Sequence, residues 1–143
     1  MVCFFLASKG GNGAAEVSLG LFNSLNFKKK LFEIDDSKIK NKISNFFFKI
    51  ISIFSILIKI KKISKNLNKN VIMIEGASWI GFSFFFFILC KFFLKKNTYI
   101  YHSHNIEYDI RIKNGSSKII IFLTKLFEKF IFRYCDYSTV VSL

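Results

Sequence analysis

Short β-rich runs alternate along the chain with longer segments that have helical periodicity. Between the first two runs, Val17, Leu21 and Leu25 recur every four residues, as on one face of a helix. Strands separated by helices are typical of βαβ units, so the pattern predicts an α/β fold with a parallel sheet flanked by helices. The predicted strands are residues 2–8, 31–34, 71–76, 98–103 and 137–142, and the predicted helices are residues 14–27, 45–65, 79–94 and 117–134, the last capped by Ser116.

Two of the predicted helices are apolar enough to raise the question of a membrane. Segment 77–94 carries a single charge and is near the lower length of a transmembrane helix. Segment 45–65 is apolar except for one narrow stripe, a pattern typical of interfacial helices. Strands and polar turns flank both segments, which favours a soluble α/β core over a small integral membrane protein. The stripe consists of Lys49, Ser52, Ser55, Lys59 and Lys62.

The charge of the chain indicates an anionic partner. The net charge is +13, and the region from Lys28 to Lys69 contains 12 Lys against three acidic residues. We interpret this region as a contact for an anionic membrane surface, with a simply solvated basic face as the alternative. Nucleic acid is not expected, because basic clusters interleaved with base-stacking motifs are not evident. With 52% hydrophobic and 18% aromatic residues, the composition excludes a disordered or fibrous chain.

Cysteine usage and the N-terminus indicate a cytoplasmic location. Cys3, Cys90 and Cys135 are far apart and form no CxxC or CxxH pattern, so we expect buried or free thiols in a reducing compartment. The N-terminal MVCFFLASKGG lacks a basic region and its apolar run is too short for a signal peptide. At 143 residues the chain has the size of one domain, and no internal repeat or linker is visible.

Three unusual loops follow predicted strands. They are KGGNG at residues 9–13, EGASW at residues 75–79 and HSHNIEYD at residues 102–109. In an open parallel sheet, ligands bind beyond the carboxyl ends of the strands. The three loops are therefore expected to converge on one edge of the sheet and to form the functional site there.

The glycine-rich loop has the chemistry of a phosphate contact. Glycines at the start of a helix let backbone N–H groups approach a phosphate. The dinucleotide fingerprint fails, because Glu16 occupies its last position, and no Gly-Lys-Ser/Thr makes a Walker loop. Glu33 keeps a nicotinamide-type site open as an alternative, and a plain strand-to-helix turn would also explain the glycines. The loop residues are Gly10, Gly11, Asn12 and Gly13.

Both histidines of the chain lie in the third loop. His102 and His104 are two residues apart and would share a face if the strand continued. A metal pair needs a third ligand, and Glu107 is the only nearby candidate, so we expect no metal. A proton-transferring or hydrogen-bonding histidine is the functional interpretation. The alternative is a capped turn built by Asn105 and Asp109.

Four segments resemble, in order, the N-terminal half of family 4 glycosyltransferases. They are GGNGAAEVSLGLFNSL, VIMIEGASW, YIYHSHNIEYDIR and LFEKFIFRYCDYSTVVS, and together they cover nearly all of the chain. The HNIEY stretch is the most diagnostic. These enzymes are retaining transferases of the GT-B architecture, in which two Rossmann-like domains face each other across a cleft. The resemblance implies that residues 1–143 are an N-terminal Rossmann-like domain.

The resemblance also implies roles for individual residues. His104, rather than His102, matches the family histidine that faces the transferred sugar, and is the expected catalytic residue. The glycine loop would lie beside the diphosphate of the donor. Asn105 and Glu107 would shape the cleft wall. The implied substrate-binding residues are Gly10, Gly11, Asn12, Gly13, Glu75, Trp79, Asn105 and Glu107, and the family needs no metal or cofactor.

The implied activity is transfer of a sugar from a nucleotide-sugar to a cell-envelope glycan or lipid-linked acceptor. The implied location is the inner face of the cytoplasmic membrane, which agrees with the Lys-rich helix near residues 46–69. The chain stops where the family's N-terminal domain continues, and the donor-binding domain is missing, so we expect no transfer by these residues alone. The alternatives are a non-catalytic remnant at the membrane surface and a small integral membrane protein.

Overall fold

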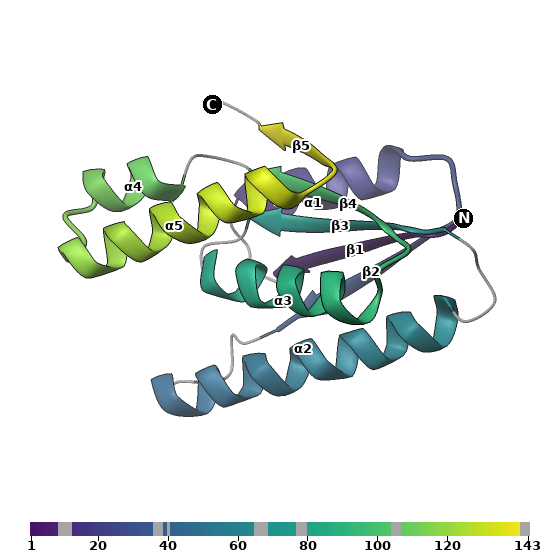
Figure 1. Cartoon of the computed structure of the whole chain (residues 1–143), viewed down its shortest axis with the longest axis horizontal. Coiled ribbons are helices and arrows are strands. Elements are labelled where there is room, and N and C mark those ends of the chain that lie inside the picture. Colours follow the sequence, from purple (N-terminus) through teal and green to yellow (C-terminus); the bar gives the residue numbers. More distant parts are fainter. Residues whose placement is uncertain are drawn as a thin grey trace.

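The computed structural model contains a parallel β-sheet flanked by helices, which confirms the predicted Rossmann-like α/β class (Figure 1). The strands are β1 (Cys3–Ser8), β2 (Lys29–Ile34), β3 (Val71–Gly76), β4 (Thr98–Ser103) and β5 (Tyr137–Val140). The helices are α1 (Gly13–Ser24), α2 (Lys42–Ser64), α3 (Ile80–Phe93), α4 (Glu107–Lys113) and α5 (Lys118–Tyr134). The structure describes residues 1–8, 13–35, 39, 41–64, 69–76, 80–103 and 107–140.

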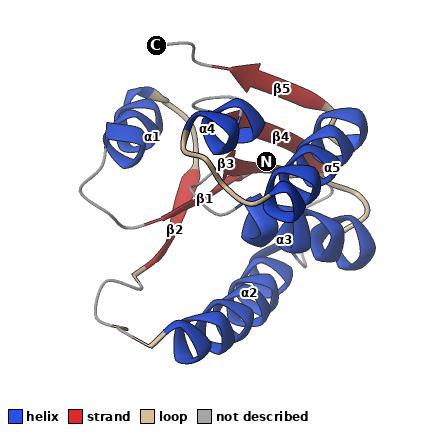
Figure 2. Ribbon diagram, turned by 90° about the vertical axis from the view of Figure 1, so that its left-hand side faces the viewer, coloured by secondary structure: helices blue, strands red, loops and turns tan. Residues whose placement is uncertain are grey.

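The described strands lie in the order β2-β1-β3-β4-β5, and every neighbouring pair is parallel. Parallel neighbours need crossover connections, and helices provide them here. Figure 2 shows α1 on one side of the sheet and α2, α3 and α5 on the other. The short helix α4 lies beyond the carboxyl ends of the strands (Figure 1).

The larger core lies between the sheet and the three helices α2, α3 and α5. Alternate side chains of the strands point to this face, as the two-residue period of a strand requires. Aromatic rings pack edge to face at its centre, with the Phe87 and Tyr99 ring centroids 5.8 Å apart. Its largest fully buried side chains are Tyr99, Tyr101, Phe4, Phe86, Phe87, Ile60, Ile72, Ile74 and Ile131.

The core on the α1 side is smaller. Cys3 and Met73 are its buried side chains, and Leu21, Phe22 and Leu25 pack against them. Lys29, which the sequence places in a basic cluster, belongs to this layer. Its ammonium donates hydrogen bonds to the carbonyls of Phe22 and Leu25 and so caps the end of α1.

The structure differs from the sequence prediction around α4 and the start of α5. The predicted cap Ser116 is wrong, because Ser117 caps α5 and its side-chain oxygen accepts from the backbone N–H of Ile120. Ser116 instead donates its N–H to the carbonyl of Arg111 and completes the end of α4. Gly115, with φ of 62°, makes the left-handed turn that ends this helix. The sequence pattern had not predicted α4, which is only 7 residues long.

Candidate functional site

The carboxyl ends of β1, β3 and β4 lie side by side, because these strands are neighbours in the sheet. The chain leaves β1 toward β2 at one side of the sheet and leaves β3 toward β4 at the other. The direction therefore reverses between β1 and β3, and sheets of this order bind ligands at such a switch point. The three loops that the sequence singled out start at these three strand ends.

The described part of the chain holds three of the predicted site residues. Gly13 is the first residue of α1, Glu75 lies near the end of β3, and Glu107 is the first residue of α4. Six other predicted residues lie outside the described residues: Gly10, Gly11, Asn12, Trp79, His104 and Asn105.

Glu75 helps to join β3 to α3. The residue is buried and lies opposite His102 in the register of β3 and β4. Its carbonyl oxygen accepts a 2.8 Å hydrogen bond from the Ser83 hydroxyl, which is also buried. This bond links the end of β3 to the first turn of α3 and fixes the two ends of the loop that contains Trp79.

Gly76 is required by a close approach between strands. A Cβ atom at this position would lie 2.6 Å from the Tyr101 hydroxyl oxygen and 3.3 Å from the Ser103 Cα. The first distance is far inside van der Waals contact, and the Ser103 backbone cannot easily move away. Gly76 therefore lets β3 and β4 end together at the site edge. The sequence had indicated only that this glycine ends a strand.

A buried carboxylate from α5 caps α4. Glu128 accepts hydrogen bonds from the backbone N–H groups of Glu107 at 2.9 Å and Tyr108 at 3.3 Å. The Glu107 carboxylate lies 3.8 Å from an Arg111 guanidinium nitrogen. Burial raises the pKa of both the Glu107 and the Glu128 carboxyls. Glu128 thereby fixes the start of α4, to which the segment with His104 is attached.

Glu128 was not predicted from the sequence as a residue of the site. The available signal was helical spacing, because Glu128 shares an inward face with Thr124 and Ile131. A glutamate on the inward face of an otherwise apolar helix indicates a buried polar partner. The partner itself lies about twenty residues earlier, in a helix that the pattern had not predicted.

The His102 side chain makes a contact within the sheet. Its side chain is buried, and Nδ1 lies 2.7 Å from the Thr139 hydroxyl oxygen on β5. The two residues are partners in the register of β4 and β5. Of the two histidines, this one holds the edge strand in place.

The three cysteines are free thiols, as predicted. Cys3 and Cys90 are buried and Cys135 is half-buried. Burial raises the pKa of the Cys3 thiol to about 11 and raises that of Cys90 further. Among the described residues, no group of three or more His, Cys, Asp or Glu side chains is placed to hold a metal ion.

The helices α2 and α5 turn apolar residues away from the sheet. The outer stripe of α2 follows helical spacing opposite its buried Ile53 and Ile60. The outer stripe of α5 likewise lies opposite Thr124 and Glu128. The α2 stripe consists of Ile43, Phe47, Ile51, Phe54 and Ile58, and the α5 stripe consists of Ile119, Phe122, Leu123, Leu126 and Phe130, all of them exposed.

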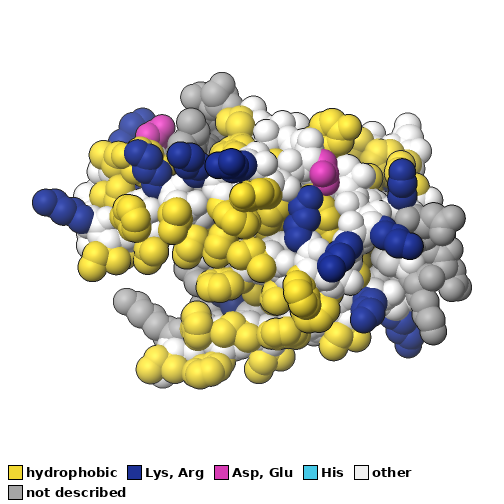
Figure 3. Space-filling view, viewed as in Figure 1, with side chains coloured by type: hydrophobic (Ala, Val, Ile, Leu, Met, Phe, Trp, Pro, Cys, Tyr) yellow, Lys and Arg dark blue, Asp and Glu magenta, His cyan; other side chains and the backbone are white. Residues whose placement is uncertain are grey.

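These stripes belong to one face of the molecule. Figure 3 shows hydrophobic side chains over α2, α3 and α5 on this face, with lysine and arginine along much of its border. Within the described residues, Ile43–Ser64 is the one helix long and apolar enough to cross a membrane. That helix also contributes Ile53, Ile56 and Ile60 to the main core. One face of this helix therefore packs in the core, and the helix has a second apolar face that is exposed.

Comparisons with protein-family models, curated proteins and solved structures find no match to this chain.

Proposed function

We propose that this chain is the acceptor-side domain of a retaining glycosyltransferase that works on the inner face of the cytoplasmic membrane. The enzyme transfers a sugar from a nucleotide-sugar to a cell-envelope glycan or lipid-linked acceptor. The observation that carries the proposal is the adjacency of the β1, β3 and β4 ends at the switch point. The loops that leave these ends contain the motifs that resemble family 4 glycosyltransferases.

The proposed mechanism depends on orientation and charge stabilisation. Backbone N–H groups at the start of α1 bind the diphosphate of the donor. His104 faces the transferred sugar, and Glu75 and Trp79 line the acceptor side. Catalysis comes from aligning the two substrates and stabilising the departing nucleoside diphosphate. A GT-B enzyme needs two such domains across a cleft, so we expect transfer only when a donor-binding domain is supplied.

The apolar face supports a membrane as the partner. Residues of the α2 and α5 stripes are positioned to enter the apolar layer of a bilayer, as amphipathic interfacial helices do. The net charge of +13 favours an anionic surface, where each basic side chain near the headgroups contributes about 1 kcal/mol. A second copy of the chain would bring two strongly positive molecules together.

The single tryptophan of the chain, Trp79, reports on the proposed site. We expect its fluorescence to change saturably when uridine or guanosine diphosphate, or a matching nucleotide-sugar, is titrated in. Gly11→Val should weaken this binding, because a side chain there would block the approach of the phosphates. Gly20→Ala is the matched control, since a Cβ on that exposed helical residue meets no atom within 4 Å.

Two outcomes would contradict the site assignment. One is fluorescence that does not respond to any of these nucleotides. The other is Gly11→Val binding as tightly as the wild type. In a form complemented with a donor-binding domain, His104→Ala should abolish most transfer, and near wild-type activity in that variant would remove His104 from the catalytic role.

The apolar face also favours a second candidate function, a non-catalytic module at the membrane surface. Flotation with phosphatidylglycerol vesicles tests the docking that both candidates share. Ile51→Asp combined with Phe122→Asp should abolish flotation, whereas Lys113→Gln, an exposed change on α4, should not. Flotation without nucleotide binding would favour the non-catalytic module. Retention in the membrane after alkaline carbonate extraction would indicate an integral protein instead.

A further inference from the structure

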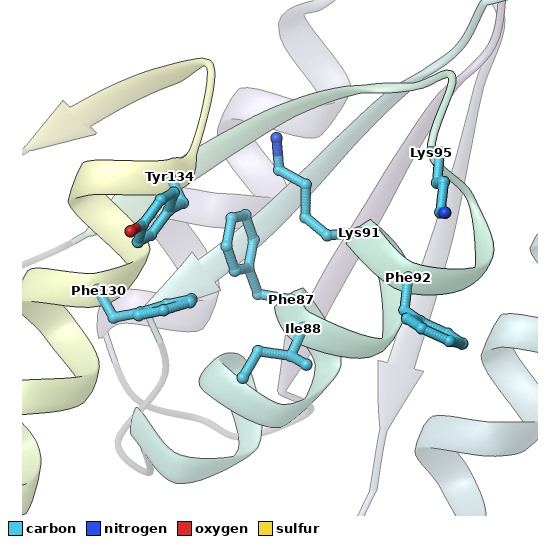
Figure 4. A pocket seen from close by; sticks show the side chains of 7 residues that line it. All are labelled: Phe87, Ile88, Lys91, Phe92, Lys95, Phe130 and Tyr134. Atoms are coloured by element: carbon cyan, nitrogen blue, oxygen red, sulfur yellow. The ribbon is translucent and has the colours of Figure 1, made fainter.

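A groove of about 380 Å³ runs between α3 and α5 on the apolar face (Figure 4). It lies toward the C-terminal ends of both helices, far along the sheet from the candidate site. In Figure 4, Phe130 and Tyr134 of α5 stand on one side, and the other lining side chains come from α3 and the turn after it. The lining residues are Phe87, Ile88, Lys91, Phe92, Lys95, Phe130 and Tyr134.

The floor of the groove is buried and its walls are exposed. Phe87 is buried, and its ring packs edge to face against Tyr99 at 5.8 Å and Phe130 at 6.5 Å. Phe130 in turn lies 4.5 Å from the Tyr134 ring. Phe92, Phe130 and Tyr134 are exposed, so the groove opens onto the same surface as the α5 stripe.

The cations at the groove outnumber the acids. The Lys91 ammonium lies 4.5 Å from the Tyr99 ring and 3.6 Å from the Asp136 carboxylate. The Lys95 ammonium lies 5.8 Å from the Phe92 ring, and the Arg133 guanidinium lies 5.8 Å from the Tyr134 ring. Two cations, Lys91 and Lys95, therefore line the groove, and one carboxylate, that of Asp136, lies beside Lys91. Arg133 lies next to Tyr134, outside the lining. An apolar trough with a positive end is complementary to an anionic amphiphile.

We propose that this groove binds one acyl chain of an anionic phospholipid, whose phosphate is held by Lys95 at the end of the groove. The inference rests on the membrane docking proposed above, and it specifies a single bound lipid rather than general contact with a bilayer. An anionic phospholipid is favoured over a zwitterionic one because the surplus of positive charge repels a choline headgroup.

Short-chain lipids test the groove without a bilayer. Dihexanoyl-phosphatidylglycerol, kept below its micelle concentration, should bind about tenfold more tightly than dihexanoyl-phosphatidylcholine, the equivalent of about 1.4 kcal/mol. Calorimetry gives the affinities, and methyl NMR gives the location. The Ile88 methyl resonances should shift on binding, whereas those of Ile51 and Ile58 on the α2 stripe should not.

Two pairs of variants assign the binding to the groove. Lys95→Glu should weaken phosphatidylglycerol binding about tenfold, because it places an anion in place of a cation beside the lipid phosphate. Lys96→Glu, a change in the neighbouring exposed residue outside the lining, is its control. Ile88→Trp should fill the groove and prevent binding, while Ile58→Trp on α2 should not. Thermal unfolding of each variant checks that it folds.

The outcomes separate this inference from the docking proposal. Three results would each contradict lipid binding in the groove. They are equal affinity for the two lipids, unchanged binding by Lys95→Glu, and resonance shifts at Ile58 in place of Ile88. If the protein floats with vesicles but does not bind the short-chain probe, the proposed membrane docking stands and the proposed lipid binding in the groove is wrong. If the protein binds the probe at Ile88 but does not float with vesicles, the lipid binding in the groove stands and the proposed membrane docking is wrong.

Discussion

The neighbouring helices α3 and α5 differ in the residues that they bury. They are in direct contact, since the Phe84 and Phe127 rings stack at 4.1 Å. α3 buries Phe86 and Cys90, whereas α5 buries the polar Thr124 and Glu128 beside Ile131 and exposes apolar residues such as Phe122. Both helices are rich in phenylalanine and isoleucine, so composition alone does not decide which face lies inside.

The difference follows from what lies beneath each helix. α3 packs on β3, where the sheet offers apolar side chains, whereas α5 packs mainly on α3 and α4. The inward face of α5 therefore meets the backbone N–H groups at the start of α4, and these need an acceptor such as Glu128. Phe130 of the α5 stripe packs against Phe84 and Phe87 of α3, whereas the rest of the stripe is exposed and is available to a membrane.

The largest expected difference in stability is between variants of a buried phenylalanine of α3 and of an exposed phenylalanine of α5. Phe86→Ala should lower the free energy of unfolding by roughly 3–5 kcal/mol, because the ring is 0% exposed and leaves a cavity. Phe122→Ala, at a ring 64% exposed, should change it by less than about 0.5 kcal/mol. Urea unfolding measures both. Similar losses in the two variants would mean that the α5 stripe is packed in solution.

Removing the polar contact of α5 should have the next largest effect. Glu128→Ala should lower the free energy of unfolding by about 2 kcal/mol, because the backbone N–H groups of Glu107 and Tyr108 lose their acceptor. Glu33→Ala, which removes an exposed carboxylate on β2, is the control. Hydrogen exchange should show faster exchange of these two amides in the Glu128 variant only. Unchanged exchange would exclude Glu128 as the cap of α4.

The contact between the two helices should have a smaller effect. In a double-mutant cycle, Phe84→Leu and Phe127→Leu should couple by roughly 0.5–1.5 kcal/mol, the range for an aromatic pair. The same cycle with Phe84 and the exposed Phe122 should show no coupling and serves as the control. Additive losses at Phe84 and Phe127 would mean that the two helices are not joined by this ring stack.

The smallest effect is a change in the pH dependence of stability. Because burial raises the pKa of Glu107 and Glu128, the folded chain holds these protons more tightly than the unfolded chain. Their contribution is fully present below the ordinary value of 4.5 and is lost as the pH rises through the raised values. Glu128→Gln should therefore flatten the decline in unfolding free energy above pH 4.5.

The groups that face Glu128 set the background for this measurement. They are Glu107 and Asp109 of α4 and Tyr101 of β4, and Arg111 acts on Glu107. A Glu128→Gln profile as steep as that of the wild type would mean that Glu128 contributes no proton linkage.

Most of the fold could be predicted because its signals are local. Runs of β-branched and aromatic residues marked the strands, and four-residue periodicity marked α1. The structure places β2 two residues earlier than predicted, because Lys29 and Lys30 belong to the strand although lysine is a weak strand former. Lys29 is there for a tertiary reason, the cap that it provides for α1.

For the candidate site, only its position in the fold could be predicted from the sequence. Parallel topology and strand order follow from pattern, so the convergence of three loop starts at one edge was foreseeable. Helix α4 could not be predicted in the same way, because its start is capped by Glu128, a residue of a later helix. Glu107, predicted as a wall of the cleft, lies buried beside Arg111. Its role in binding stays a prediction, as does the role of His104.

The distribution of the thiols makes the two layers of the molecule separately observable. Cys3 lies in the small core under α1, Cys90 in the large core under α3, and Cys135 at the end of α5 beside β5. A thiol reacts as its thiolate, so a buried cysteine can be alkylated only after its layer opens. The rates of alkylation at these three positions would therefore give, in one experiment, the opening frequencies of the two faces of the sheet and of its outer edge.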